Sequence, residues 1–287
     1  MIVLHLTWLL NSFHLATSYR HLPNNQVPSY TYGGGKPAHQ RYRATLQDIP
    51  FHVLVVYSNL YCSGALIRSK IAITSASCLI VDVIRRPVVK VGSETITGPG
   101  QVIPIIDIKL HEYYKYMSSI DNDIAMLVLK EHVAFNHLVK KAVIVEPEVT
   151  LRTGVTIEVS GYGNINLGQT YVNQLIWTEM AVMDNEECSL THKHLLTNSN
   201  FCAKYAPERR LSDNGGPAVY NRDLLVGILS YGGTNETAPH IAIFTNISYF
   251  HRWILLNTKR YLEKYCLPNS DSSEYSDNDE GNDSASS

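Results

Sequence analysis

Short runs of apolar and β-branched residues, separated by Ser, Asn and Gly, recur along the chain from residue 51 onwards. The clearest are Phe51–Tyr57, Ala65–Ile67 and Ile71–Thr74. Runs of this length, bounded by turn-forming residues, are typical of strands in an antiparallel barrel. No helix longer than one turn is predicted before residue 180. The pattern therefore predicts a chain that is β-sheet over most of its length.

The end of the chain has a different period. Between Ser248 and Tyr265 the apolar residues recur at intervals of three and four, which predicts an amphipathic helix with one buried face. These residues are Phe250, Trp253, Ile254, Tyr261, Leu262 and Tyr265. Residues 267–287 are polar, acidic and rich in Ser and Asn, a composition that buries too little apolar surface to fold. We expect a solvated tail there, or one that contacts a cationic partner.

The first residues resemble a targeting signal. Residues 2–10 form an apolar run broken by His5 and Thr7, and Ala16-Thr17-Ser18 supplies the small residues that signal peptidase reads. We interpret residues 1–18 as a removed signal peptide and residues 19–30 as a loose leader. The alternative is a short uncleaved anchor, although the run is shorter than the ~20 residues that span a bilayer. A signal predicts a secreted, extracellular protein in which cysteines pair.

Composition and charge limit the classes of function. The chain has 287 residues, 45% of them hydrophobic, which is enough for one large all-β domain or two ordinary ones. Lys and Arg number 24 against 26 Asp and Glu, so the basic excess of a nucleic-acid binder is missing. No glycine-rich phosphate loop is present, and we predict no cofactor. His192 and His194 have no third ligand nearby in sequence, so we interpret them as part of an exposed polar loop and predict no metal site.

Four blocks, in the same order, resemble segments that define the chymotrypsin/trypsin family of serine proteases. They are Cys62-Ser63-Gly64 with Ala76-Ser77-Cys78, then Asp121–Leu129, then Val155–Gly163, and Leu211–Pro217. The resemblance covers residues 31–266. It implies an all-β fold of two packed six-stranded antiparallel β-barrels with a C-terminal α-helix, and a junction between the barrels near residues 146–153.

The resemblance also assigns the positions of the catalytic triad. Ser77 stands where the family has its His, Asp123 where it has the orienting Asp, and Asn214 where it has the nucleophilic Ser. A hydroxyl does not accept the proton that imidazole accepts near neutral pH, and a carboxamide has no hydroxyl to deprotonate. We therefore predict that the chain is not an enzyme. Asp123 then becomes a buried carboxylate that receives hydrogen bonds from Ser77, Ser230 or backbone N–H groups.

The rest of the cleft departs from the family pattern as well. In the oxyanion loop, formed by Ser212, Asp213 and Asn214, Ser212 replaces a Gly, and Gly reaches backbone conformations that Ser reaches only at a cost. The positions of the specificity pocket are Glu208, Ser230, Gly232 and Ala242. An acid such as Glu208 implies a preference for a basic side chain, but Ala242, where a Gly usually opens the pocket, favours a filled or collapsed pocket.

The family's disulfides imply two pairings here, Cys62–Cys78 and Cys188–Cys202. Its third disulfide has no cysteine at either end, because Arg210 and Thr234-Asn235 occupy those places. Cys266 remains unpaired, either as a free thiol or as one half of an intermolecular bridge. Asn235 and Asn246 begin N-glycosylation sequons, and we expect both to carry glycans.

The segment Thr31-Tyr32-Gly33-Gly34 resembles the family's mature N-terminus, which activating cleavage after a basic residue creates. The residue before it is Tyr30, so a trypsin-like activator finds no basic residue to cut after. We predict that this switch is not used and that Asp213 lacks its usual partner, the new amino terminus.

Together these residues predict a secreted, non-catalytic serine protease homologue that acts as a binding or regulatory module. Such a module serves as a protease cofactor, a decoy or a recognition protein, in settings such as defence or reproduction. The expected partner is a protein: a protease, an inhibitor or another ligand. The alternatives are a weakly active endopeptidase that uses a rearranged site, and a structural extracellular protein.

Overall fold

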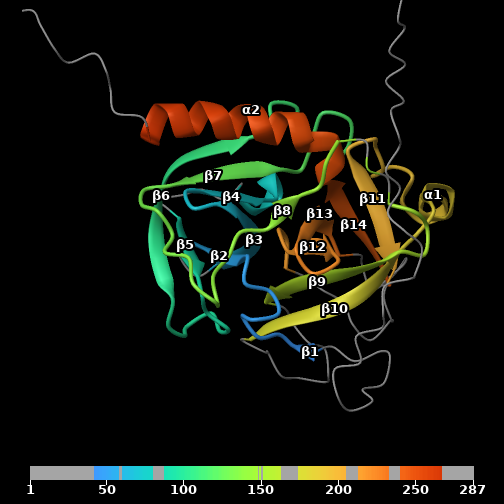
Figure 1. Cartoon of the computed structure of the whole chain (residues 1–287). Helices are drawn as coiled ribbons and strands as arrows, with labels where there is room; N and C mark the ends of the chain where they lie inside the picture. The colour runs from blue at the N-terminus through green and yellow to red at the C-terminus, as the bar shows by residue number, and fades with distance from the viewer. Residues whose placement is uncertain are drawn as a thin grey trace, which may run out of the picture.

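Two closed barrels and a C-terminal helix make up the fold, which confirms the predicted class (Figure 1). The structure is a computed structural model that describes residues 42–57, 60–79, 87–147, 149, 151–162, 174–204, 213–232 and 240–266. Several predicted features lie outside these residues. They are the signal peptide, the leader, Thr31–Gly34, Glu208, Ser212, Asn235 and the tail from residue 267.

The first barrel closes in the strand order β2-β3-β4-β7-β6-β5, with β5 paired back to β2, and every pairing is antiparallel. Its strands are β2 (His52–Tyr57), β3 (Leu60–Arg68), β4 (Ile71–Thr74), β5 (Val88–Val91), β6 (Gln101–Leu110) and β7 (Ala125–Leu129). A short 3-10 helix, η1 (Ala76–Leu79), follows β4. The runs predicted at residues 51–57, 65–67 and 71–74 lie in β2, β3 and β4.

The second barrel closes in the order β9-β10-β11-β14-β13-β12, with β12 paired back to β9. Its strands are β9 (Thr156–Tyr162), β10 (Leu175–Val182), β11 (Asn200–Lys204), β12 (Pro217–Tyr220), β13 (Leu224–Tyr231) and β14 (Ile241–Asn246). Two short strands lie outside the ring: β1 (Tyr42–Arg43) pairs with β10, and β8 (Val143–Ile144) pairs in parallel with β13. Helix α1 (Asn185–His192) is capped by Asp184, whose side chain accepts from the N–H of Glu186.

Two consecutive residues of the segment that connects the barrels form hydrogen bonds to different barrels. The N–H of Ala142 donates to Leu66 of the first barrel at 2.8 Å, and the N–H of Val143 donates to Asp223 of the second at 2.9 Å. A single cluster of buried apolar side chains also extends through both barrels, for example Ile73 in one and Phe244 in the other. The two barrels therefore share one core and hold the residues between them in fixed positions.

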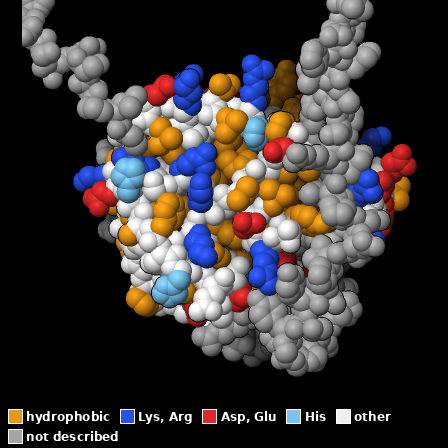
Figure 2. Space-filling view, in the orientation of Figure 1, with side chains coloured by type: hydrophobic (Ala, Val, Ile, Leu, Met, Phe, Trp, Pro, Cys, Tyr) orange, Lys and Arg blue, Asp and Glu red, His pale blue; other side chains and the backbone are white. Residues whose placement is uncertain are grey.

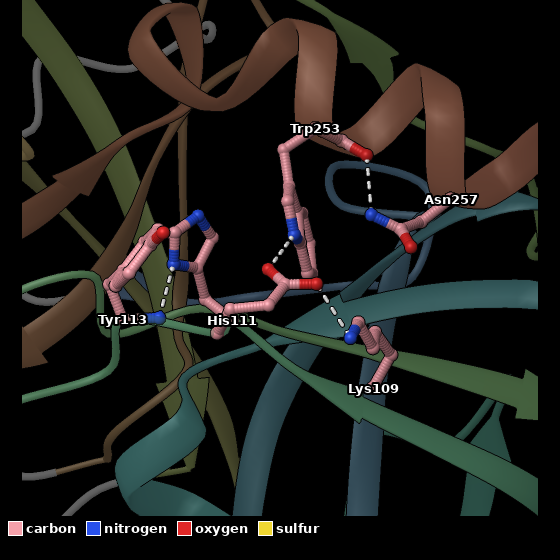
Figure 3. A network of polar contacts seen from close by, with 6 residues as sticks. Lys109, His111, Tyr113, Trp253 and Asn257 are labelled. Atoms are coloured by element: carbon pink, nitrogen blue, oxygen red, sulfur yellow. Dashed lines mark hydrogen bonds and ion pairs between the residues drawn. The ribbon is translucent and has the colours of Figure 1, made fainter.

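Helix α2 (Ile247–Cys266) confirms the helix predicted from the apolar repeat, and Figure 1 shows it lying across β7 and β6. Figure 3 shows one of its attachments, in which the indole Nε1 of Trp253 donates to the carboxylate of Glu112 at 2.9 Å. Lys109 forms an ion pair with the same carboxylate at 2.6 Å. Near the end of the helix, the Tyr265 hydroxyl donates to Asp107 of β6 at 2.8 Å. These polar contacts fix a helix that follows the second barrel onto the first.

Candidate functional site

Asp123 lies at the centre of the predicted triad positions and is completely buried. The backbone N–H of Ser77 donates to its Oδ1 at 2.7 Å, and the Ser77 hydroxyl donates to its Oδ2 at 2.8 Å. The hydroxyl of Ser230 donates a further, short hydrogen bond to Oδ2. Burial raises the pKa of Asp123, and these hydrogen bonds oppose that shift. The carboxylate therefore has the environment expected from the sequence, with both oxygens occupied by donors from Ser77 and Ser230.

The local fold explains why Ser77 reaches this carboxylate. Strand β4 is fully buried and leads directly into η1, which carries Ser77 and Cys78. Cys78 is bonded to Cys62 of β3, with a Cα–Cα distance of 6.1 Å, as the sequence predicted. The second predicted disulfide, Cys188–Cys202, is also present and joins α1 to β11. The first of these bridges fixes the turn that positions Ser77.

The loop that carries Asn214 has a tightly bonded backbone. The N–H of Gly215 donates to Leu229 at 2.8 Å, and the carbonyl of Asn214 accepts from the N–H of Ser63 at 3.0 Å. Gly215 has φ of +85°, and a Cβ placed on it would lie 2.0 Å from the carbonyl oxygen of Ser63. Only Gly combines that backbone conformation with so close an approach. The loop therefore keeps a tight bend around a half-buried Asn214.

A second polar cluster lies beside this loop, around the ring of His52. The Nε2 of His52 lies 2.8 Å from the hydroxyl of Ser63, and Nδ1 lies 2.9 Å from the hydroxyl of Ser160. The Ser63 hydroxyl also donates a short hydrogen bond to Oδ2 of Asp213, and the N–H of Tyr162 donates to the same oxygen at 2.5 Å. The other oxygen, Oδ1, is buried and has no hydrogen-bond partner among the residues that the structure describes.

The hydrogen bonds in this cluster determine which atom carries each proton. Ser63 has one hydroxyl proton, and it goes to Asp213 when that carboxylate is ionised. The Nε2 of His52 must then carry the hydrogen that points at Ser63, and Nδ1 accepts from Ser160. When Asp213 is protonated, it can donate to Ser63, which then donates to Nε2. The serine lies between imidazole and carboxylate, whereas in a catalytic triad the imidazole lies between the other two.

Burial sets the charges of this cluster. It lowers the pKa of His52 to about 3, so the ring is neutral at physiological pH. Burial also raises the pKa of Asp213 to about 7, against the hydrogen bonds from Ser63 and Tyr162, which lower it. Near neutral pH the cluster therefore has a proton that moves on and off Asp213 while His52 stays uncharged.

The remaining predicted residues have different surroundings. Gly232 directly follows β13, and the buried Ala242 lies in β14, opposite Ala203. The side-chain oxygen of Asn246, the sequon asparagine that the structure describes, accepts from the N–H of Ser248 at 3.1 Å. Cys266 ends α2. Within the described ranges, no three His, Cys, Asp or Glu side chains are grouped so that they could hold a metal ion.

Comparison with known proteins decides the family. The sequence profile of trypsin matches residues 34–254, which is most of the chain. This protein belongs to the trypsin family. Trypsin zeta of Drosophila melanogaster is 25% identical over 253 residues, covering 81% of this chain and 88% of the relative. Granzyme B of Rattus norvegicus is 29% identical over 233 residues, covering 78% and 89%. Alkaline trypsin B of Manduca sexta is 24% identical over 227 residues, covering 75% and 88%.

One prediction from the sequence is wrong. We predicted that this chain is not an enzyme because the His and Ser of the triad are replaced, at Ser77 and Asn214. The structure contains an imidazole, His52, hydrogen-bonded to Ser63 and Ser160 inside a trypsin-type fold. Relatives that match over most of the chain are named trypsins. The reasoning failed because it considered one sequence position, whereas strand pairing in a barrel can bring an imidazole in from another strand.

The His52 cluster was missed by the sequence analysis, although a signal for it existed. His52 is a polar residue near the start of the apolar run Phe51–Tyr57, and it is only 4% exposed. A histidine inside a predicted buried strand needs hydrogen-bond partners, so its position alone indicated a buried polar cluster.

Proposed function

We propose that this member of the trypsin family acts chiefly by binding another protein, as a cofactor of a protease, a decoy or a recognition protein. The observation that carries the proposal is the arrangement at Asp123, where the hydroxyls of Ser77 and Ser230 occupy the carboxylate. In a catalytic triad this carboxylate accepts from an imidazole, so the Ser77 hydroxyl in that place leaves Asp123 with no base to orient. The tight loop around Asn214 likewise supports a rigid surface, which is what recognition of a protein requires.

Secretion belongs to the same proposal. The N-terminal apolar run supports it, and so do the two disulfides, which persist in oxidising compartments. Within the part of the chain that the structure describes, neither helix is long and apolar enough to cross a membrane. The partner is expected to be an extracellular protease, an inhibitor of such proteases or another protein ligand.

Hydrolysis by a rearranged site is a second candidate, and the contact between His52 and Ser63 favours it. A separation of 2.8 Å between Nε2 and the hydroxyl is within the reach of a general base. Ser63 is fully buried, however, so a substrate carbonyl meets this hydroxyl only after the neighbouring loop moves. The pKa of His52, lowered to about 3, also makes the ring a weak base.

Labelling with a fluorophosphonate probe separates the two candidates. We would compare the secreted protein with Ser63→Ala, and with Ser77→His/Asn214→Ser as a positive control that places an imidazole beside Asp123 and a hydroxyl on the Asn214 loop. If binding is the chief activity, labelling and peptide turnover by the natural chain should stay far below those of the positive control. Labelling and turnover that match the control and disappear in Ser63→Ala would overturn the binding proposal in favour of hydrolysis.

Binding itself is measured by calorimetry against a trypsin-type protease and against a protein inhibitor of such proteases. We expect one of them to bind, and Asn214→Trp to weaken that binding at least tenfold, because the indole is too large for a half-buried position on this tight loop and would protrude into the binding surface. Lys193→Trp, at an exposed position beyond α1, is the matched control and should bind like the natural chain. Absence of binding to both proteins would contradict the cofactor and decoy roles.

A further inference from the structure

Helix α2 packs one side on the barrels and exposes the other. Figure 1 shows it along the edge of the molecule, and Figure 2 shows Lys, Arg and apolar side chains along that edge. The exposed residues, which we call the outer face of α2, are Tyr249, Arg252, Leu255, Leu256, Lys259, Arg260, Glu263 and Lys264. They include three large apolar side chains, of which Leu256 is 58% and Tyr249 56% exposed.

The outer face has four cationic side chains and one carboxylate. Lys264 contacts Asp107 at 3.2 Å, and Lys259 lies 3.9 Å from Glu263. Arg252 and Arg260 add two further positive charges to the same face. A surface that combines excess positive charge with exposed leucines favours an occupant that is acidic and able to cover apolar carbon.

The chain itself continues from this helix with such a segment. Residues 267–287 contain six carboxylates and no Lys or Arg: Asp271, Glu274, Asp277, Asp279, Glu280 and Asp283. They also contain one aromatic residue, Tyr275, and one leucine, Leu267. The composition of this segment is therefore complementary to the outer face in charge, and Tyr275 is far enough along the chain to cover Leu255 and Leu256.

The lengths also agree. Helix α2 has 20 residues and is about 30 Å long, at 1.5 Å for each residue. The 21 residues that follow can extend to about 70 Å. The first carboxylate, Asp271, is five residues beyond Cys266, which allows it to reach back about 17 Å, beyond Arg260. The acidic segment can therefore run back along the whole helix.

We propose that residues 267–287 dock on the outer face of α2. Attachment to the end of the helix keeps the segment at a high local concentration, on the order of millimolar, so weak contacts suffice. Contacts between exposed charges are screened by salt, so the docking weakens as ionic strength rises. The segment then covers the cationic face at low salt and exposes it at high salt. This inference is independent of the proposed function.

Chemical modification of the full-length secreted chain tests the proposal. Lys259 is acetylated with a limiting reagent, and Arg252 and Arg260 are modified with phenylglyoxal, each followed by mass spectrometry. The comparison variant changes the six acidic residues of the segment to Asn or Gln. We expect Lys259 and Arg260 to react at least threefold faster in that variant, and also in the natural chain at ~1 M salt. Lys193, exposed beyond α1, is the internal control and should keep its rate.

A charge-reversal variant completes the test. In Arg252→Glu/Arg260→Glu the segment should be released, so Lys259 should react at the same rate whether the segment is acidic or neutralised. Circular dichroism checks that these substitutions of exposed residues leave α2 folded. Equal rates for the natural and neutralised chains at low salt would overturn the proposal. Protection that grows with protein concentration would also overturn it, because the occupant would then be a second copy of the chain.

Discussion

The Nε2 of His52 lies 2.8 Å from the hydroxyl of Ser63, and both side chains are almost completely buried. The same hydroxyl donates to Asp213, so one oxygen atom links an imidazole with a carboxylate. Burial shifts the pKa of each group in the direction that disfavours its charge. The stability of the protein therefore depends on pH through two opposing titrations.

The two titrations have opposite signs. The unfolded chain protonates His52 below about pH 6.5, whereas the folded chain does so only near pH 3, so stability falls with falling pH. The folded chain protonates Asp213 near pH 7 and the unfolded chain only near pH 4, so stability rises with falling pH. Each contributes about 1.4 kcal/mol per pH unit. We predict that the two contributions cancel between about pH 4 and pH 6.5.

Single substitutions separate the two contributions. In Asp213→Asn only His52 remains, and the free energy of unfolding should fall, relative to the natural chain, by about 1.4 kcal/mol for each pH unit below 6.5. In His52→Gln only the titration of Asp213 remains. The free energy of unfolding, relative to the natural chain, should then rise by about 1.4 kcal/mol for each pH unit below 6.5. Urea unfolding at several pH values measures both. Parallel pH profiles for the two variants and the natural chain would contradict this account.

A glycine fixes the loop beside this cluster. Gly215→Ala would place a methyl group 2.0 Å from the carbonyl of Ser63, at φ of +85°. We expect a loss of about 3 kcal/mol or more, since both the backbone conformation and the neighbouring strand must give way. Gly154→Ala is the matched control, because Gly154 has φ of +84° but no atom of the described residues within 4 Å of an added Cβ. Thermal unfolding measures both variants, and Gly154→Ala should lose only about 1 kcal/mol.

The sequence was sufficient for the fold and for part of the site. Apolar runs of three to seven residues predicted β2, β3 and β4 of the first barrel, and the three-and-four repeat predicted α2. The resemblance to a known family predicted that Ser77 and Ser230 donate hydrogen bonds to Asp123. The His52 cluster was not predictable in the same way. Its partner Ser160 is 108 residues away, and only the closing of two barrels brings the two side chains together.

A double-mutant cycle measures how much the contact between Trp253 of α2 and Glu112 contributes to the free energy of unfolding. Trp253→Phe removes the indole donor to Glu112 and keeps an aromatic ring against His111. We expect a loss of about 1 kcal/mol, because the Trp253–Glu112 contact is exposed. Glu112→Ala removes the acceptor and also the ion pair with Lys109, so it should cost at least as much, and the double variant should cost less than the sum. Strict additivity in this cycle would show that the hydrogen bond in Figure 3 contributes nothing to stability.

Asp123 offers the clearest distinction between a structural and a catalytic carboxylate. In Asp123→Asn the amide oxygen can accept from the N–H of Ser77, and its NH₂ group can donate to the hydroxyls of Ser77 and Ser230, which then turn to accept. Because burial raises the pKa of Asp123, the neutral amide also avoids a buried charge. We therefore expect stability at pH 7 within about 1 kcal/mol of the natural chain.

Asp123→Ala removes the acceptor and leaves the buried Ser230 and the partly buried Ser77 without a partner there. It should cost about 3 kcal/mol or more, from unpaired polar groups together with the cavity. Chemical unfolding of the two variants at pH 7 gives the comparison. If Asn proved as damaging as Ala, the negative charge itself would be needed in this cleft. The hydrogen bonds from Ser77 and Ser230 would then depend on the charge of the carboxylate and not only on its oxygen atoms.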